Sequence, residues 1–125
     1  MSRRGTKRIL VIDDDLFFSK VLAQLLERCG YEVTVAHNGT EGIDCYRKEL
    51  PDLVITDLRM PEKDGLETIA ELQSEFSDSK VIAISGGDPQ NLPIARKLGA
   101  RHTFVKPFDT EELLETIEEE LGMSV

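Results

Sequence analysis

The strongest constraint on the fold of this chain is a regular alternation of two kinds of segment. Five short segments are apolar and rich in β-branched residues, and each is followed by a longer segment with apolar residues at helical spacing. Continuous apolar runs of this length are typical of parallel strands that are covered on both faces. The strands are expected at residues 8–12, 32–36, 53–56, 81–84 and 103–105.

The longer segments predict helices. In the first of them Val21, Leu22, Leu25 and Leu26 form one apolar stripe, and Gly30 follows as a stop signal. Strands that alternate with helices imply right-handed crossovers, so the expected fold is α/β with an open, doubly wound parallel sheet of five strands. The helices are expected at 16–29, 40–48, 66–76, 89–98 and 110–121, the last of them capped by Asp109 or Thr110.

The chain has the length of one domain. Its 125 residues are 40% hydrophobic, which is enough to form a core. No apolar run approaches the ~20 residues that cross a bilayer, and the basic N-terminus lacks the apolar stretch of a secretory signal. We therefore expect a single domain over 1–125 with its core at about 7–121, no output domain, a cytoplasmic location and no membrane association.

Charge and cysteine content restrict the partners and the compartment. Lys and Arg number 15 against 24 Asp and Glu, so the net charge is −9 and the chain repels a phosphate backbone. We expect no direct binding of nucleic acid. Cys29 and Cys45 form no CxxC motif and lie at no zinc-binding spacing from a histidine, so free thiols in a reducing compartment are expected.

Polar residues follow four of the predicted strands. In an open α/β sheet, ligands bind beyond the carboxyl ends of the strands, so these residues are expected to converge at one edge. They are Asp13, Asp14 and Asp15 after the first strand, Asp57 after the third, Ser85 and Gly86 after the fourth, and Lys106 and Pro107 after the fifth.

Asp13, Asp14 and Asp57 would repel one another unless a cation neutralised them. Mg²⁺ takes carboxylate oxygens, keeps several waters and completes its octahedron with phosphate oxygens. Lys106 adds a point charge suited to phosphate, and Ser85 adds a hydroxyl. Each residue has an ordinary interpretation taken alone, since Asp15 suits an N-cap and the others suit loops. Their joint occurrence at the strand ends instead favours a Mg²⁺ site with a phosphoryl group on Asp57.

Longer matching stretches connect these residues to a known family. The chain closely resembles the receiver domain of two-component response regulators over about residues 7–121. The resemblance implies a flavodoxin-like fold with strand order 2-1-3-4-5. The stretches that carry it are ILVIDDD at 9–15, PDLVITDLRMP at 51–61, Asp64-Gly65, IAISG at 82–86, Gly99-Ala100 and Lys106-Pro107-Phe108.

The resemblance implies a role for each matching residue. Asp57 matches the phosphoacceptor, Lys106 the lysine that pairs with the phosphoryl group, and Ser85 the hydroxyl that turns toward it. For Mg²⁺, Asp14 and Asp57 match direct ligands, Asp13 acts through water, and the backbone carbonyl of Arg59 is a further ligand. The bond between Lys106 and Pro107 matches one that is usually cis.

The family's activity is signalling and not turnover of an external substrate. The resemblance implies a phosphoryl donor, either a histidine kinase or a histidine phosphotransfer protein, and a downstream protein that binds over 89–98, 103–105 and 110–121. Ser85, Thr103, Lys106 and Pro107 match the switch positions. The family often has Tyr or Phe where this chain has Thr103, and strand alternation points Phe104 to the other face, which argues against relay through a swinging aromatic.

Two other functions remain open from the sequence. An aspartyl-phosphate phosphatase of the haloacid-dehalogenase type also uses a strand-end aspartate with Mg²⁺, but it requires a second aspartate where this chain has Arg59. A receiver-like module that binds its partner without phosphorylation is the other alternative, and the presence of Asp57 and Lys106 argues against it. The glutamates of 110–121 are interpreted as a solvated face, with docking of a basic partner as the alternative.

Overall fold

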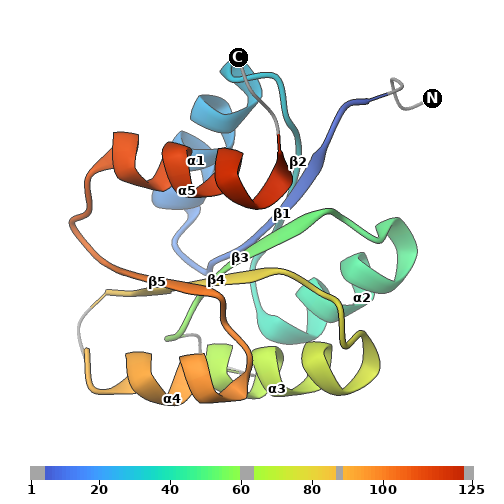
Figure 1. Ribbon diagram of the computed structural model, residues 1–125, viewed down its shortest axis with the longest axis vertical. Helices are drawn as coiled ribbons and strands as arrows, with labels where there is room; N and C mark the ends of the chain where they lie inside the picture. Colours follow the sequence, from blue (N-terminus) through green and yellow to red (C-terminus); the bar gives the residue numbers. More distant parts are fainter. Residues whose placement is uncertain (1–4, 60–63, 87–88, 123–125) are drawn as a thin grey trace.

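The fold is a five-stranded parallel sheet between two layers of helices (Figure 1). The computed structural model describes residues 5–59, 64–86 and 89–122. Helices α1 and α5 cover one face of the sheet, and α2, α3 and α4 cover the other. The elements are β1 (Arg8–Ile12), α1 (Leu16–Arg28), β2 (Glu32–Ala36), α2 (Gly39–Glu49), β3 (Leu53–Asp57), α3 (Gly65–Glu75), β4 (Val81–Ser85), α4 (Asn91–Leu98), β5 (His102–Val105) and α5 (Thr110–Leu121).

The strand order confirms the predicted fold. The strands lie in the order β2-β1-β3-β4-β5, and every neighbouring pair is parallel. Strands β3 and β4 are buried along their whole length, and each is one residue longer than predicted, because Asp57 and Ser85 belong to the sheet. Two residues of the expected site are therefore fixed by strand backbone and not by loops.

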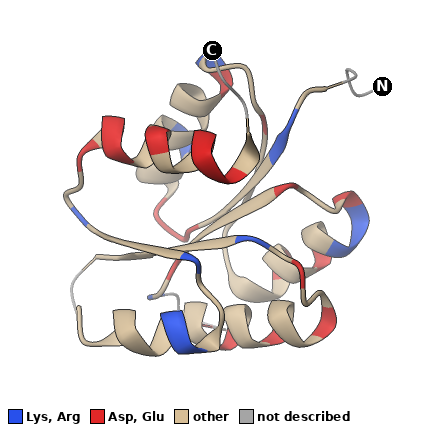
Figure 2. Cartoon of the chain, viewed as in Figure 1, with Lys and Arg blue, Asp and Glu red and all other residues tan. Residues whose placement is uncertain are grey.

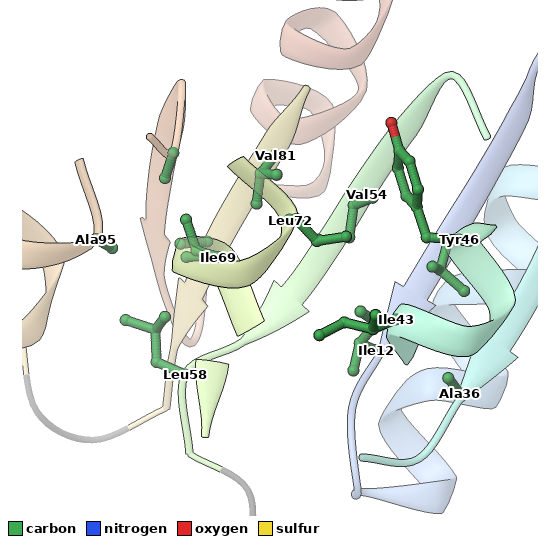
Figure 3. Close-up of a cluster of buried hydrophobic side chains, with 13 residues drawn as sticks. Ile12, Ala36, Ile43, Tyr46, Val54, Leu58, Ile69, Leu72, Val81 and Ala95 are labelled. Atoms are coloured by element: carbon green, nitrogen blue, oxygen red, sulfur yellow. The ribbon is translucent and has the colours of Figure 1, made fainter. Parts of the chain in front are cut away.

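Side chains alternate between two separate cores because successive residues of a strand point to opposite faces. Ile12, Val54 and Val81 pack under α2, α3 and α4 with Ile69 and Tyr46, as Figure 3 shows. The second core lies under α1 and α5 and is formed by Ile9, Val11, Leu22, Leu26, Tyr31, Leu53, Ile55, Ile82, Ile84, Leu113, Ile117 and Leu121. This double burial explains the uninterrupted apolar runs of the sequence.

The helix boundaries agree with the sequence except in detail. Asp15 caps α1 by accepting the Phe18 N–H at 3.0 Å, and Asp109 caps α5 by accepting the Glu111 N–H at 2.9 Å. Helix α4 begins at Asn91, two residues later than predicted. The stripe assigned to α1 was too wide, because Val21 is 49% exposed while Leu22 is buried. The helix contacts the sheet over a narrower arc than its apolar residues span.

The surface carries most of the charge. Figure 2 shows acidic residues along α5, where Glu111, Glu112, Glu115 and Glu119 are exposed. Cys29 and Cys45 are free, as predicted, and both are half-buried. No helix within the described residues is both long enough and apolar enough to cross a membrane.

Candidate functional site

Three carboxylates meet where β1 and β3 end. Oxygen atoms of Asp13, Asp14 and Asp57 all lie within 4.8 Å of one another. The parallel register pairs Ile12 with Thr56, so the residues that follow them in β1 and β3 come to the same height at the sheet edge. Asp13 and Asp57 are buried, whereas Asp14 is exposed. The predicted acidic cluster is thus assembled by sheet register.

Burial makes Asp57 hard to ionise. Asp57 is only 7% exposed. Burial, together with the negative charge of Asp13, raises the pKa of Asp57 to about 6. Lys106 and hydrogen bonding from the backbone amides of Arg59 and Leu58 oppose this rise. Within the described residues Oδ1 of Asp57 is buried without a hydrogen-bond partner. An unsatisfied carboxylate oxygen of this kind suits a cation or a new bond.

Asp13 is held from two sides. The backbone N–H of Asp15 donates to its Oδ1 at 2.9 Å, and Nζ of Lys106 lies 3.3 Å from its Oδ2. Burial raises the pKa of Asp13, and these two contacts act in the opposite direction. Asp13 is therefore oriented before any ligand binds.

Lys106 approaches the carboxylates from the end of β5, the edge strand on the side of β4. It follows β5, and its backbone N–H donates to the Ser85 carbonyl at 2.8 Å, which continues the β4–β5 ladder by one bond. Its ammonium lies 3.9 Å from the centroid of the Phe18 ring as well as beside Asp13. The Lys106–Pro107 peptide bond is cis, as predicted.

The residues predicted as switch positions belong to β4, to β5 and to the segment that follows β5. Ser85 is buried at the end of β4, opposite Val105 of β5. Thr103 lies opposite Ala83, on the face covered by α4, and is half-buried. Phe104 packs into the other core, under α1 and α5, as strand alternation predicted. Thr103 and Phe104 therefore lie on opposite faces of β5.

Helix α3 packs against the backbone that carries Asp57. Gly65 begins α3, and its N–H donates to the Leu58 carbonyl at 3.0 Å. A Cβ atom on Gly65 would overlap the Asp57 carbonyl oxygen and lie 2.6 Å from Leu58 Cα. Arg59 follows this contact and is exposed. The absence of a side chain at residue 65 thus lets α3 support the floor of the site.

A comparison with known proteins decides the family. The sequence pattern of the response regulator receiver domain matches residues 9–118. The chain belongs to this family. The receiver is 34% identical to the chemotaxis protein CheY of Bacillus subtilis over 117 residues, which cover 92% of this chain and 98% of that protein. Receivers are signalling domains of two-component systems, in which phosphorylation of an aspartate with Mg²⁺ is typical.

Solved structures agree with this assignment. A CheY-like receiver domain protein from Methanospirillum hungatei has a TM-score of 0.89 at 31% identity, covering 94% of this chain and 95% of that one. The response regulator TrrA of Thermotoga maritima, solved in complex with Mg²⁺-BeF, has a TM-score of 0.85 at 32% identity and covers 92% and 99%. The arrangement of strands and helices in this receiver is therefore that of a shared fold.

Two contributors to the site were missed by sequence reasoning. Phe18 was treated only as part of a helix, although its place one turn after the aspartates puts it beside the strand ends. Gly65 was noticed only as part of a family motif, with no packing role. Met60 and Pro61, which belong to the matching stretch 51–61, lie outside the described residues.

Proposed function

We propose that Asp57 of this receiver accepts a phosphoryl group from a phosphohistidine, carried by a histidine kinase or by a histidine phosphotransfer protein. One observation carries the proposal. Asp13, Asp14 and Asp57 come together within 4.8 Å, and a lysine ammonium lies beside Asp13. Such a cluster is costly without a bound cation, and it supplies both a nucleophile and countercharge for a phosphoryl group.

The chemistry of the donor set fits Mg²⁺. All side-chain donors are carboxylate oxygens, burial raises the pKa values of Asp13 and Asp57, the negative charge of Asp13 adds to the rise at Asp57, and Asp57 Oδ1 is unsatisfied among the described residues. Asp14 and Asp57 would hold the ion directly, Asp13 through water, and the backbone carbonyl of Arg59 would add a ligand. When bound, Mg²⁺ supplies positive charge that neutralises the carboxylates and the oxygens of the incoming phosphoryl group. The complex of TrrA with Mg²⁺-BeF supports this choice of ion.

The transfer uses few groups of the protein. A carboxylate oxygen of Asp57 forms a bond to phosphorus while the P–N bond to histidine breaks, and the electron pair leaves with the imidazole nitrogen, which takes a proton from solvent. Lys106 neutralises charge on the transferred oxygens, and the Ser85 hydroxyl donates to one of them. Positioning and electrostatics therefore provide most of the acceleration.

The phosphoryl group then acts as a switch. It adds about −1.5 to −2 charge next to Asp13 and Asp14, which draws Lys106 and Ser85 toward it and repacks the neighbouring loops. The resemblance to the family supports including Thr103 and Pro107 among the switch residues. We propose that the downstream protein reads the change on the surface formed by α4, β5 and α5, where Ile94 is 47% and Val105 44% exposed.

The decisive experiment is intact mass after incubation with acetyl phosphate, with and without Mg²⁺. One added phosphoryl group is expected in the wild type with Mg²⁺ and in the Asp78→Asn variant, because Asp78 is an exposed aspartate at the opposite end of the sheet. The Asp57→Asn variant should gain none. Stoichiometric labelling of that variant would contradict the assignment. Sustained turnover of a phosphomonoester would favour the phosphatase alternative, and beryllofluoride binding separates a short-lived phosphoryl group from an inactive site.

A further inference from the structure

The ammonium of Lys106 lies between two different groups, and this position is called the lysine seat. One group is the carboxylate of Asp13, with Nζ 3.3 Å from Oδ2. The other is the face of Phe18, whose ring centroid lies 3.9 Å from Nζ. A cation at this distance over an aromatic face is attracted by the ring quadrupole. The lysine side chain is 21% exposed, so solvent screens the attraction only in part.

The Phe18 ring is itself held in place. It meets the Phe108 ring edge to face, with centroids 6.0 Å apart and planes at 85°. Phe108 in turn packs against Phe104 of β5 at 5.8 Å. These three half-buried rings connect the lysine seat to the core under α1 and α5. The ring that faces Lys106 is thus part of a packed row and not a loose surface side chain.

The seat is not on the unsatisfied oxygen of Asp57. Oδ1 of Asp57 has no hydrogen-bond partner among the described residues, although Lys106 is near enough for its charge to lower the Asp57 pKa. A hollow of about 470 Å³ is lined by Phe18, Gly86, Lys106, Pro107, Phe108 and Thr110. The side chain of Lys106 therefore borders space into which it can move.

We propose that Phe18 is a positioning residue for Lys106, which holds the ammonium in a waiting position until a phosphoryl group on Asp57 draws it off the ring. This inference rests on the proposed function of Asp57. The departure of Lys106 leaves the Phe18 face without its cation, and the change passes through Phe108 to Phe104 under α5. Residue 103 of this chain is a threonine and not an aromatic residue. The row of rings instead provides a route on the opposite face of β5.

The waiting position has a direct signature in the free protein without metal. Protons on Cε of a lysine whose ammonium lies over a ring face are shifted upfield in the NMR spectrum by the ring current. We expect this shift for Lys106 in the wild type and its loss in the Phe18→Leu variant. Phe17→Leu is the matched control, because Phe17 lies on the same helical turn but is 79% exposed. Phe18→Met repeats the test if the leucine variant does not fold.

The competition is measured by the affinity for beryllofluoride with Mg²⁺, followed by NMR titration. Because the ring no longer competes for the lysine, Phe18→Leu should bind about 3- to 10-fold more tightly than the wild type. Phe18→Tyr retains an aromatic face and should restore the wild-type affinity. In a Lys106→Met background the Phe18→Leu change should have no effect, which a general loosening of the helix would not reproduce.

The outcomes separate the two proposals. Failure of the wild type to bind beryllofluoride overturns the proposed function of Asp57 and the release step with it. Binding that is lost in Asp57→Asn but unchanged in Phe18→Leu overturns the inference alone. A Lys106 proton shift that survives Phe18→Leu, or an affinity gain that persists without Lys106, also overturns it.

Discussion

The backbone carbonyl oxygen of Asp57 lies too close to position 65 for any residue with a Cβ atom, because Gly65 starts α3 directly against it. The contact continues to Leu58, whose Cα would lie 2.6 Å from that Cβ and whose carbonyl accepts the Gly65 N–H at 3.0 Å. Real Cβ atoms do not approach backbone this closely, so a side chain here must displace either α3 or the strand end. The position of the Asp57 carboxylate therefore depends on the absence of a side chain at residue 65.

Gly65→Ala should damage both stability and the site. We expect a loss of about 1–3 kcal/mol in the free energy of unfolding, since overpacking forces the backbone to shift. Mg²⁺ affinity should fall as well, because the shift moves Asp57 away from Asp13 and Asp14. Denaturant unfolding and a Mg²⁺ titration check both effects. Gly86→Ala is the control, because its Cβ would meet only Lys106 Cδ at 3.7 Å, and equal losses in both variants would contradict the argument.

Asp57→Asn should stabilise the folded protein without metal at neutral pH. The pKa of Asp57 rises from 3.8 in the unfolded chain to about 6 in the folded one, so the folded state binds its proton more tightly. Stability then falls as the pH rises through this range, and the full cost of about 3 kcal/mol is present above about pH 6. The gain of the asparagine variant should therefore be largest at neutral pH and should disappear below about pH 4.

Unfolding curves of both proteins over this pH range, recorded with a chelator, test the sign. Mg²⁺ should reverse the order, since only the wild type offers the Asp57 carboxylate. The apparent affinity of the wild type for Mg²⁺ should weaken below about pH 6 as Asp57 takes up a proton. If the asparagine variant is less stable than the wild type at neutral pH without metal, the prediction that burial of the ionised Asp57 carboxylate destabilises the fold is wrong.

Glu120 should show the opposite pH dependence. Burial alone would raise its pKa, but hydrogen bonds from Arg101 and His102 outweigh burial and lower the pKa below the ordinary 4.5. The ionised carboxylate therefore stabilises the folded state above about pH 4.5, and the stabilisation is lost as the pH falls through the lowered value.

Glu120→Gln should cost about 1 kcal/mol of unfolding free energy at neutral pH, because it weakens the link between α5 and the start of β5. Glu119→Gln is the matched control, since Glu119 is an exposed neighbour on the same helix. The difference between the two variants should vanish in acid. A constant difference at every pH would indicate a packing defect and not a lost charge interaction.

The sequence predicted the fold well because hydrophobic pattern and fold coincide here. Buried strands give continuous apolar runs, so residues 8–12 and 32–36 were placed correctly at both ends. Asp13, Asp14, Asp57 and Lys106 were also found together, since parallel strands bring their carboxyl ends to one edge and the residues after them must converge. Predicting that Asp13 and Asp57 lie together required no knowledge of side-chain packing.

The missed features depend on contacts that have no periodicity. Val21 is apolar but exposed, because the width of the helix–sheet contact depends on how α1 sits against the sheet. Phe18 acts through its distance to Lys106, a residue 88 positions later in the sequence, and nothing local indicates that pairing. Gly65 matters because backbone of Asp57 and Leu58 fills the space that a Cβ atom would need, which composition cannot reveal. Long-range side-chain geometry, and not secondary structure, is what the sequence left undetermined.

Lys106→Met should destabilise the protein without metal in a pH-dependent way. Methionine keeps much of the apolar stem but removes the charge 3.3 Å from Asp13, whose side chain is 3% exposed. Two buried carboxylates then lack their nearest cation, so a loss of about 1–3 kcal/mol is expected at neutral pH. The loss should shrink below about pH 6 as Asp57 is protonated. Mg²⁺ should rescue this variant more than the wild type, because the ion no longer competes with Lys106 for Asp13. Lys20 is an exposed lysine of α1, so Lys20→Met should change neither the free energy of unfolding nor its increase with Mg²⁺. A loss in Lys106→Met that does not depend on pH would assign the effect of that substitution to packing.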